Sequence, residues 1–128
     1  MQAMQLFWGK VISGQKRGKA LGFPTANVLL HKNIADGIYV SLVRIDKTRY
    51  HALTFIGRAI TFGETQITAE SYVLDYSGSL YGRFITIQLL KKLRENKKFA
   101  NSNELIIQMK KDEKEARLFF ATQTQNPN

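Results

Sequence analysis

Short runs of aromatic and β-branched residues, bounded by glycine or polar residues, occupy most of the first ninety positions. Such runs are typical of β-strands separated by turns. Asp36-Gly37 and Asp75-Tyr76-Ser77-Gly78 are the clearest turn signals. The segment 58–66 follows Gly57 and is predicted to be a loop. The pattern predicts strands at 6–13, 26–30, 38–45, 50–56, 68–74 and 83–89.

The pattern changes after residue 100. Asn101 is followed three positions later by Glu104, which is the spacing of a helix-capping box. Beyond this cap, apolar residues recur on one broad helical face, and most of the lysines lie on the other side. A helix is therefore predicted from this cap to about Phe120, with a polar tail at 121–128. Its apolar face comprises Leu105, Ile106, Met109, Ala116, Phe119 and Phe120.

Strands followed by one long helix favour an all-β core with the helix packed on it. With so few strands, closure into a small barrel would remove exposed edges, so a barrel is favoured over an open sheet. The sequence contains no internal repeat and no composition break. We therefore expect residues 1–128 to form one domain, with a core at about 6–120.

Composition narrows the function only a little. The chain has no cysteine, no apolar run of membrane-spanning length and no signal-peptide pattern at its start, which fits a cytoplasmic monomer without membrane contact. The formal net charge of +9 favours an anionic partner, such as nucleotide phosphates or nucleic acid. For most of the basic residues at 91–117, a solvated helix face is the preferred interpretation.

The most distinctive stretch is 14–27. Gly14, Gly18 and Lys19 supply flexible backbone and charge, and Gly22 leads into the sequence Phe-Pro-Thr-Ala-Asn at 23–27. It is not a Walker A loop, because three residues rather than four separate the first two glycines and alanine follows the lysine. A phosphate-binding site and an ordinary flexible loop before a proline turn are equally compatible with this spacing.

Three further residues could carry chemistry. Thr25 and Asn27 project to one side of an extended chain, where their oxygens could hold a hard cation such as Mg²⁺ or could bond local backbone groups. Glu70 lies in mid-strand on the same face as Tyr72. It could act as a general base, or it could pair with a surface lysine.

Taken together, these features resemble the riboflavin kinase family. The similarity covers about 7–117, in the family's order, which makes it far more specific than any single motif. Its elements are Gly9-Lys10-Val11, Gly14, Gly18-Lys19, Leu21-Gly22-Phe23-Pro24-Thr25-Ala26-Asn27, Asp36-Gly37-Ile38-Tyr39, Ile56-Gly57, Thr61-Phe62-Gly63, Glu70, Asp75-Tyr76, Leu80-Tyr81-Gly82, Leu93-Arg94-Glu95, Lys98-Phe99, Asp112 and Ala116.

The resemblance implies a six-stranded Greek-key β-barrel with a C-terminal helix. It also implies transfer of the γ-phosphoryl group of ATP to the 5′-hydroxyl of riboflavin, giving FMN and ADP. Thr25 and Asn27 would hold Mg²⁺, with Mn²⁺ or Zn²⁺ as alternatives, and Glu70 would be the catalytic base. The loop from Gly14 to Gly22, with Lys19, would bind the nucleotide, and Arg94 and Phe99 would bind the flavin.

The chain departs from the family pattern at Lys19, Ile60 and Tyr72, where arginine, proline and histidine are usual. These departures leave open a flavin- or nucleotide-binding regulatory module with weakened catalysis. The net charge of +9 and the basic region 91–117 leave open a nucleic-acid-binding module. We also expect a kinase domain alone, without the adenylyltransferase domain of common bacterial relatives. The expected partners are the small molecules ATP, ADP, riboflavin and FMN.

Overall fold

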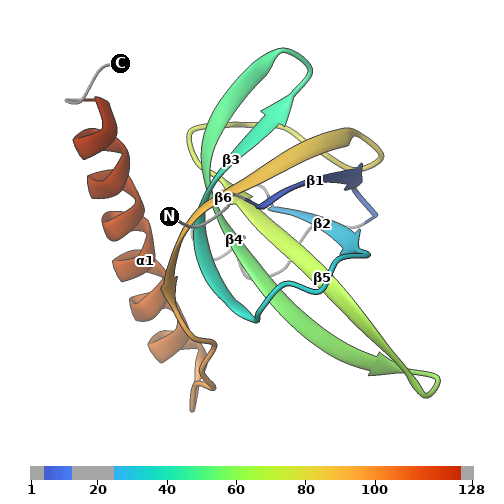
Figure 1. Cartoon of the computed structure of the whole chain (residues 1–128). Helices are drawn as coiled ribbons and strands as arrows, with labels where there is room; N and C mark the ends of the chain where they lie inside the picture. The colour runs from blue at the N-terminus through green and yellow to red at the C-terminus, as the bar shows by residue number, and fades with distance from the viewer. Residues whose placement is uncertain (1–4, 13–24, 125–128) are drawn as a thin grey trace.

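A computed structural model describes residues 5–12 and 25–124 (Figure 1). Six antiparallel strands form a nearly closed barrel, and one helix follows them, which confirms the predicted fold class. The elements are β1 (Gln5–Lys10), β2 (Thr25–Leu30), β3 (Gly37–Ile45), β4 (Thr48–Thr61), β5 (Glu64–Val73), β6 (Phe84–Arg94) and α1 (Ser102–Thr124).

The strand order is β1-β6-β3-β4-β5-β2. Strands β3, β4 and β5 are consecutive antiparallel neighbours, and β6 returns to pair with β3, which is the connection of a Greek key. β1 and β2 lie at the two ends of this order, and they meet to close most of the barrel. Just beyond β1, the amide of Ile12 donates to the carbonyl oxygen of Asn27 at 2.9 Å.

Glycine permits this closure at one position. A Cβ atom added to Gly9 on β1 would lie 2.4 Å from Cγ1 of Val28 on β2, closer than real Cβ atoms approach other atoms. A side chain at residue 9 would therefore force Val28 or the strand backbone to shift.

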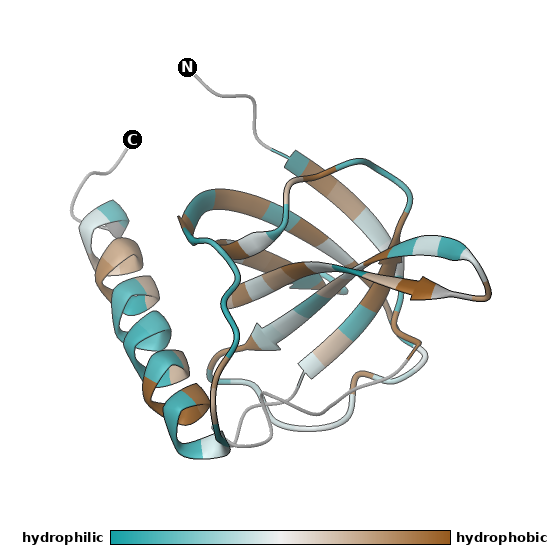
Figure 2. Ribbon diagram, turned by 90° about the horizontal axis from the view of Figure 1, so that it is seen from below, coloured by the Kyte–Doolittle hydropathy of each residue, from teal (hydrophilic) through white to brown (hydrophobic). Residues whose placement is uncertain are grey.

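The barrel wall separates two hydrophobic clusters because successive side chains of a strand point to opposite faces. The interior cluster includes Val28, Tyr39, Ala69 and Ile87. The second cluster lies on the outer face, where α1 stands along one side of the barrel (Figure 2). Its buried members are Ile38, Val40, Leu53, Tyr72, Met109, Ala116 and Phe120.

A chain of three hydroxyl groups crosses the interior. The Oγ1 atom of Thr54 lies 2.7 Å from Oγ of Ser41 and 2.8 Å from Oγ of Ser71. All three side chains are fully buried, so each needs such a partner to offset the loss of water. This chain links β3, β4 and β5 at a fixed register.

The predicted loop at 58–66 is wrong. β4 continues to Thr61 and β5 begins at Glu64, so the two strands form a long hairpin whose tip projects from the barrel (Figure 1). The turn residues Phe62 and Gly63 both have positive φ, at 53° and 80°. Positive φ at both central residues is the conformation that suits a two-residue hairpin turn. The sequence pattern did not indicate strands here because Ile60 and Phe62 are apolar residues whose side chains are 80% and 98% exposed.

Other boundaries shift less. β6 extends to Arg94 rather than ending at position 89, and α1 continues to Thr124, four residues beyond Phe120. The predicted cap is confirmed, since Oδ1 of Asn101 accepts a hydrogen bond from the amide of Glu104 at 3.0 Å. The carboxylate of Glu104 accepts from the amide of Ala100 at 3.2 Å.

Candidate functional site

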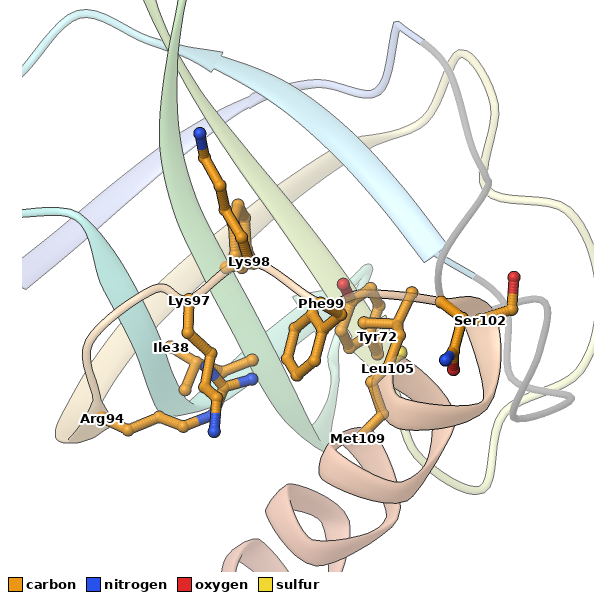
Figure 3. Close-up of a pocket in the computed structure, with 11 residues that line it drawn as sticks. Ile38, Tyr72, Arg94, Lys97, Lys98, Phe99, Ser102, Leu105 and Met109 are labelled. Carbon is orange, nitrogen blue, oxygen red and sulfur yellow. The ribbon is translucent and has the colours of Figure 1, made fainter.

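A pocket of about 540 Å³ lies between the outer face of the barrel and the first turns of α1 (Figure 3). This volume is in the range of small-molecule sites. Apolar and aromatic side chains form most of its walls, and three cations lie at its edge. The lining residues are Ile38, Phe55, Tyr72, Arg94, Lys97, Lys98, Phe99, Asn101, Ser102, Leu105 and Met109.

One row of paired residues crosses the outer face from strand β2 to this pocket. Asn27 on β2 pairs with Glu70 on β5, and Glu70 pairs with Phe55 on β4. Phe55 pairs in turn with Ile38 on β3, and Ile38 with Arg94 on β6. Neighbouring strands are about 4.8 Å apart, so Glu70 lies one strand from a residue of the pocket wall, with Asn27 beyond it.

The neighbouring row carries Thr25. It pairs with Tyr72, which lines the pocket, and Tyr72 pairs with Leu53. Thr25 and Glu70 are 7% and 8% exposed. The structure therefore brings together Thr25, Asn27 and Glu70, which are far apart in sequence, at one border of the pocket.

Arg94 and Phe99 both line the pocket, as Figure 3 shows. Arg94 is the last residue of β6, and its Nε and Nη2 atoms donate to the two carboxylate oxygens of Asp112 at 2.9 and 2.7 Å. Phe99 lies in the connection to α1, where the ammonium of Lys97 is 5.7 Å from its ring centroid. Asp112 is the buried partner that sequence reasoning missed as a site residue. An aspartate on an otherwise apolar helix face was the signal available.

The predicted nucleotide-binding residues Gly14, Gly18, Lys19 and Gly22 lie outside the described residues. Their assignment stays a prediction. The described part of the site begins where that stretch ends, at Thr25.

The donor set beside Glu70 fits Mg²⁺. Thr25 and Asn27 offer a hydroxyl and an amide oxygen, which are hard ligands, and Glu70 adds a carboxylate across the strand pair. Within residues 5–12 and 25–124, no group of three His, Cys, Asp or Glu side chains could form a metal cage. Such a sparse set suits an ion that keeps water and phosphate oxygens as its other ligands.

Among the described residues, no helix is long and apolar enough to cross a membrane.

Fold and site together define a small β-barrel domain with a largely apolar pocket beside a carboxylate and two oxygen donors. Residues 3–120 match the family model described as Flavokinase: Riboflavin kinase. The chain belongs to the riboflavin kinase family.

A bifunctional riboflavin kinase/FMN adenylyltransferase of Listeria monocytogenes is 36% identical over 117 residues, covering 88% of this chain and 37% of the relative. A crystal structure from Streptococcus pneumoniae, named macrolide-efflux protein, has a TM-score of 0.78 and 32% identity. That alignment covers 88% of this chain and 38% of the other.

Riboflavin kinase from Trypanosoma brucei has a TM-score of 0.63 at 24% identity, covering 97% of this chain and 82% of the other, and it supports the fold. The chain spans 18% to 38% of the length of the first curated relatives that it matches.

Proposed function

We propose that this chain transfers the γ-phosphoryl group of ATP to the 5′-hydroxyl of riboflavin, giving FMN and ADP. The observation that carries the proposal is the cross-strand row from Asn27 through Glu70 and Phe55 to the pocket. It places a carboxylate between a pocket suited to a planar ring and a pair of oxygen donors suited to a phosphate-bound cation.

In this arrangement the isoalloxazine ring occupies the pocket, with Phe99 and Arg94 in its wall. The ribityl chain extends along the row toward Glu70, so that its terminal hydroxyl reaches the carboxylate. Holding the hydroxyl and the phosphoryl group in line supplies most of the rate, since phosphoryl transfer depends chiefly on positioning and charge stabilisation.

Glu70 accepts the proton of the 5′-hydroxyl as that oxygen forms its bond to the γ-phosphorus. The bond between this phosphorus and the bridging oxygen breaks, and ADP leaves with the electron pair. Thr25 and Asn27 would hold Mg²⁺, which neutralises charge on the phosphates when bound. The loop from Gly14 to Gly22, with Lys19, would bind the rest of the triphosphate.

The test is incubation of the chain with riboflavin, ATP and Mg²⁺, followed by chromatographic separation of FMN. We expect FMN and ADP in equal amounts, and no FMN when a chelator removes the metal. Tight riboflavin binding without ATP consumption would instead indicate a binding module, and a salt-sensitive affinity for RNA without FMN formation would favour a nucleic-acid-binding protein.

Glu70→Gln separates the proposed base from a structural glutamate. The amide keeps the shape but cannot accept the proton, so we expect turnover to fall by roughly 10² to 10⁴ with riboflavin binding retained. Thr68→Val is a matched control on the same strand, because it removes a hydroxyl two positions from Glu70 at a residue that does not line the pocket. Normal turnover in the glutamine variant would remove Glu70 from the mechanism.

A further inference from the structure

Arg94 is held on two sides at the wall of the pocket. Its Nε and Nη2 atoms donate to Asp112, and its Nη1 atom donates to the carbonyl oxygen of Glu95 at 3.0 Å. A guanidinium group has five N–H donors. One N–H on Nη1 and one on Nη2 therefore remain without a hydrogen bond to any described residue.

Asp112 is itself held in place by α1. It is 1% exposed, and its Oδ1 atom also accepts from Nε2 of Gln108, one helical turn earlier, at 3.0 Å. The side-chain oxygen of Gln108 faces a second cation of the pocket, since Nζ of Lys97 lies 3.4 Å away. Two residues of one helix face thus contact two of the three cations that line the pocket.

Burying the Arg94–Asp112 ion pair costs free energy of folding. A fully buried carboxylate loses its hydration, and an apolar residue at position 112 could pack between helix and barrel without that loss. The arginine side chain also loses rotamer freedom when it is fixed. The bidentate pair holds the guanidinium plane of Arg94 in one orientation. Its unused N–H groups are therefore oriented before a ligand binds.

We propose that Asp112, supported by Gln108, is a positioning residue that orients Arg94 toward the hydrogen-bond-accepting edge of the ring bound in the pocket. The ligand class is a planar heteroaromatic whose edge carries carbonyl oxygens or ring nitrogens, which the pyrimidine-dione part of a flavin provides. This inference rests on the proposed function and adds how the flavin end of the site recognises its substrate.

The experiment compares Asp112→Asn with Asp75→Asn. Both substitutions replace a carboxylate that receives two hydrogen bonds from an arginine and links α1 to the barrel, but Asp75 and Arg117 do not line the pocket. Steady-state kinetics would be measured for riboflavin and for ATP. Riboflavin binding without ATP would be followed separately by quenching of flavin fluorescence.

For Asp112→Asn we expect the KM and the Kd for riboflavin to rise on the order of tenfold, as for loss of a charge-assisted hydrogen bond to a ligand, with kcat and the KM for ATP little changed. For Asp75→Asn we expect all four values to stay within about twofold. An unchanged riboflavin Kd in folded Asp112→Asn, or equal changes in both variants, would overturn the proposal.

Gln108→Leu covers the case in which Asp112→Asn does not fold. The side chain of Gln108 is only half-buried, so its loss leaves the ion pair in place but less constrained. We expect a riboflavin Kd raised about threefold, since Gln108 acts on Arg94 only through Asp112, and an unchanged value would contradict the positioning role. If the wild-type chain binds riboflavin tightly but forms no FMN, the proposed reaction fails while the recognition of the ring can still be tested by the binding arm.

Discussion

Among the described residues, two bidentate arginine–aspartate pairs link α1 to the barrel, and they differ in burial. Arg94–Asp112 lies at the pocket, with its side chains 18% and 1% exposed, whereas Arg117–Asp75 lies at the far end of the helix with 41% and 68% exposed. Their hydrogen-bond lengths are similar, at 2.7 to 2.9 Å and 3.0 to 3.1 Å. Hydrogen-bond length alone therefore does not show which pair contributes more to stability.

The two pairs are expected to differ in their contribution to stability because one is buried and the other is exposed. Water screens the exposed pair and competes for its hydrogen bonds, so its net contribution is small. The buried pair has lost its water, so each partner depends on the other. The exposed pair can therefore be lost with little change in stability. The buried pair holds helix α1 and strand β6 in one arrangement at the pocket.

Removing one partner of the buried pair should have the largest effect on stability. Asp112→Ala leaves the guanidinium of Arg94 without its carboxylate in a largely buried place, so we expect a loss of about 3–5 kcal/mol in the free energy of unfolding. Denaturant titration followed by circular dichroism measures it. The double variant Asp112→Ala with Arg94→Met should recover part of the loss, and failure to recover any would show that the cost is one of packing.

The interior hydroxyl chain extends the comparison to neutral groups. Thr54→Val keeps the shape of the side chain but removes the central hydroxyl, so Ser41 and Ser71 each lose a partner inside the barrel. We expect a loss of about 1–3 kcal/mol, smaller than for a buried charge because no ion is left uncompensated. Thr68→Val on β5, a half-buried position outside this chain, is the matched control and should change stability by less than about 0.5 kcal/mol.

The sequence indicated which candidate residues share a face better than it predicted the limits of the strands, and the roles of those residues stay predictions. Alternation on β5 placed Glu70 and Tyr72 on one face, and a single register brought Asn27 opposite Glu70. It missed the hairpin, because Ile60 and Phe62 are exposed apolar residues on a ribbon that leaves the barrel.

The role of Asp112 could not be predicted because it depends on a contact between a helix and a strand end eighteen residues apart. A helical pattern assigns Asp112 to a face but does not say that Arg94 will meet it there. The hydrogen bond from Gln108 to Asp112 can be interpreted only after that contact is known. Local rules thus identified the groups that carry the proposed chemistry, and tertiary packing was needed to find the group that orients one of them.

Breaking the exposed pair should cost little. For Asp75→Ala we expect a loss of no more than about 1 kcal/mol, because both side chains remain in water and Arg117 keeps its hydrogen bond to Glu113 at 2.8 Å. High salt should shrink the difference between this variant and the wild type. A loss as large as that of Asp112→Ala would show that burial is not what distinguishes the pairs.

The smallest expected effect is a pH dependence at the exposed end of the helix. The ring of His51 stacks on that of Phe120, with centroids 3.7 Å apart, close to both members of the exposed pair. Burial against the helix lowers the pKa of His51 below its usual 6.5, and Arg117 lowers it further, while Asp75 opposes the shift. The hydrogen bond from Arg117 lowers the pKa of Asp75 below 3.8.

The folded chain therefore favours neutral His51 and charged Asp75. The contribution of His51 is complete above its unfolded pKa of 6.5 and is lost as pH falls from there through its folded pKa, whereas that of Asp75 persists until pH falls below 3.8. Between pH 7.5 and 5, the melting temperature of wild type should drop more than that of His51→Phe, which keeps a stacked ring but cannot titrate. Equal drops in the two proteins would mean that His51 does not sense pH. Asp75→Asn should widen the difference slightly, because it removes the charge that opposes the lowering of the His51 pKa.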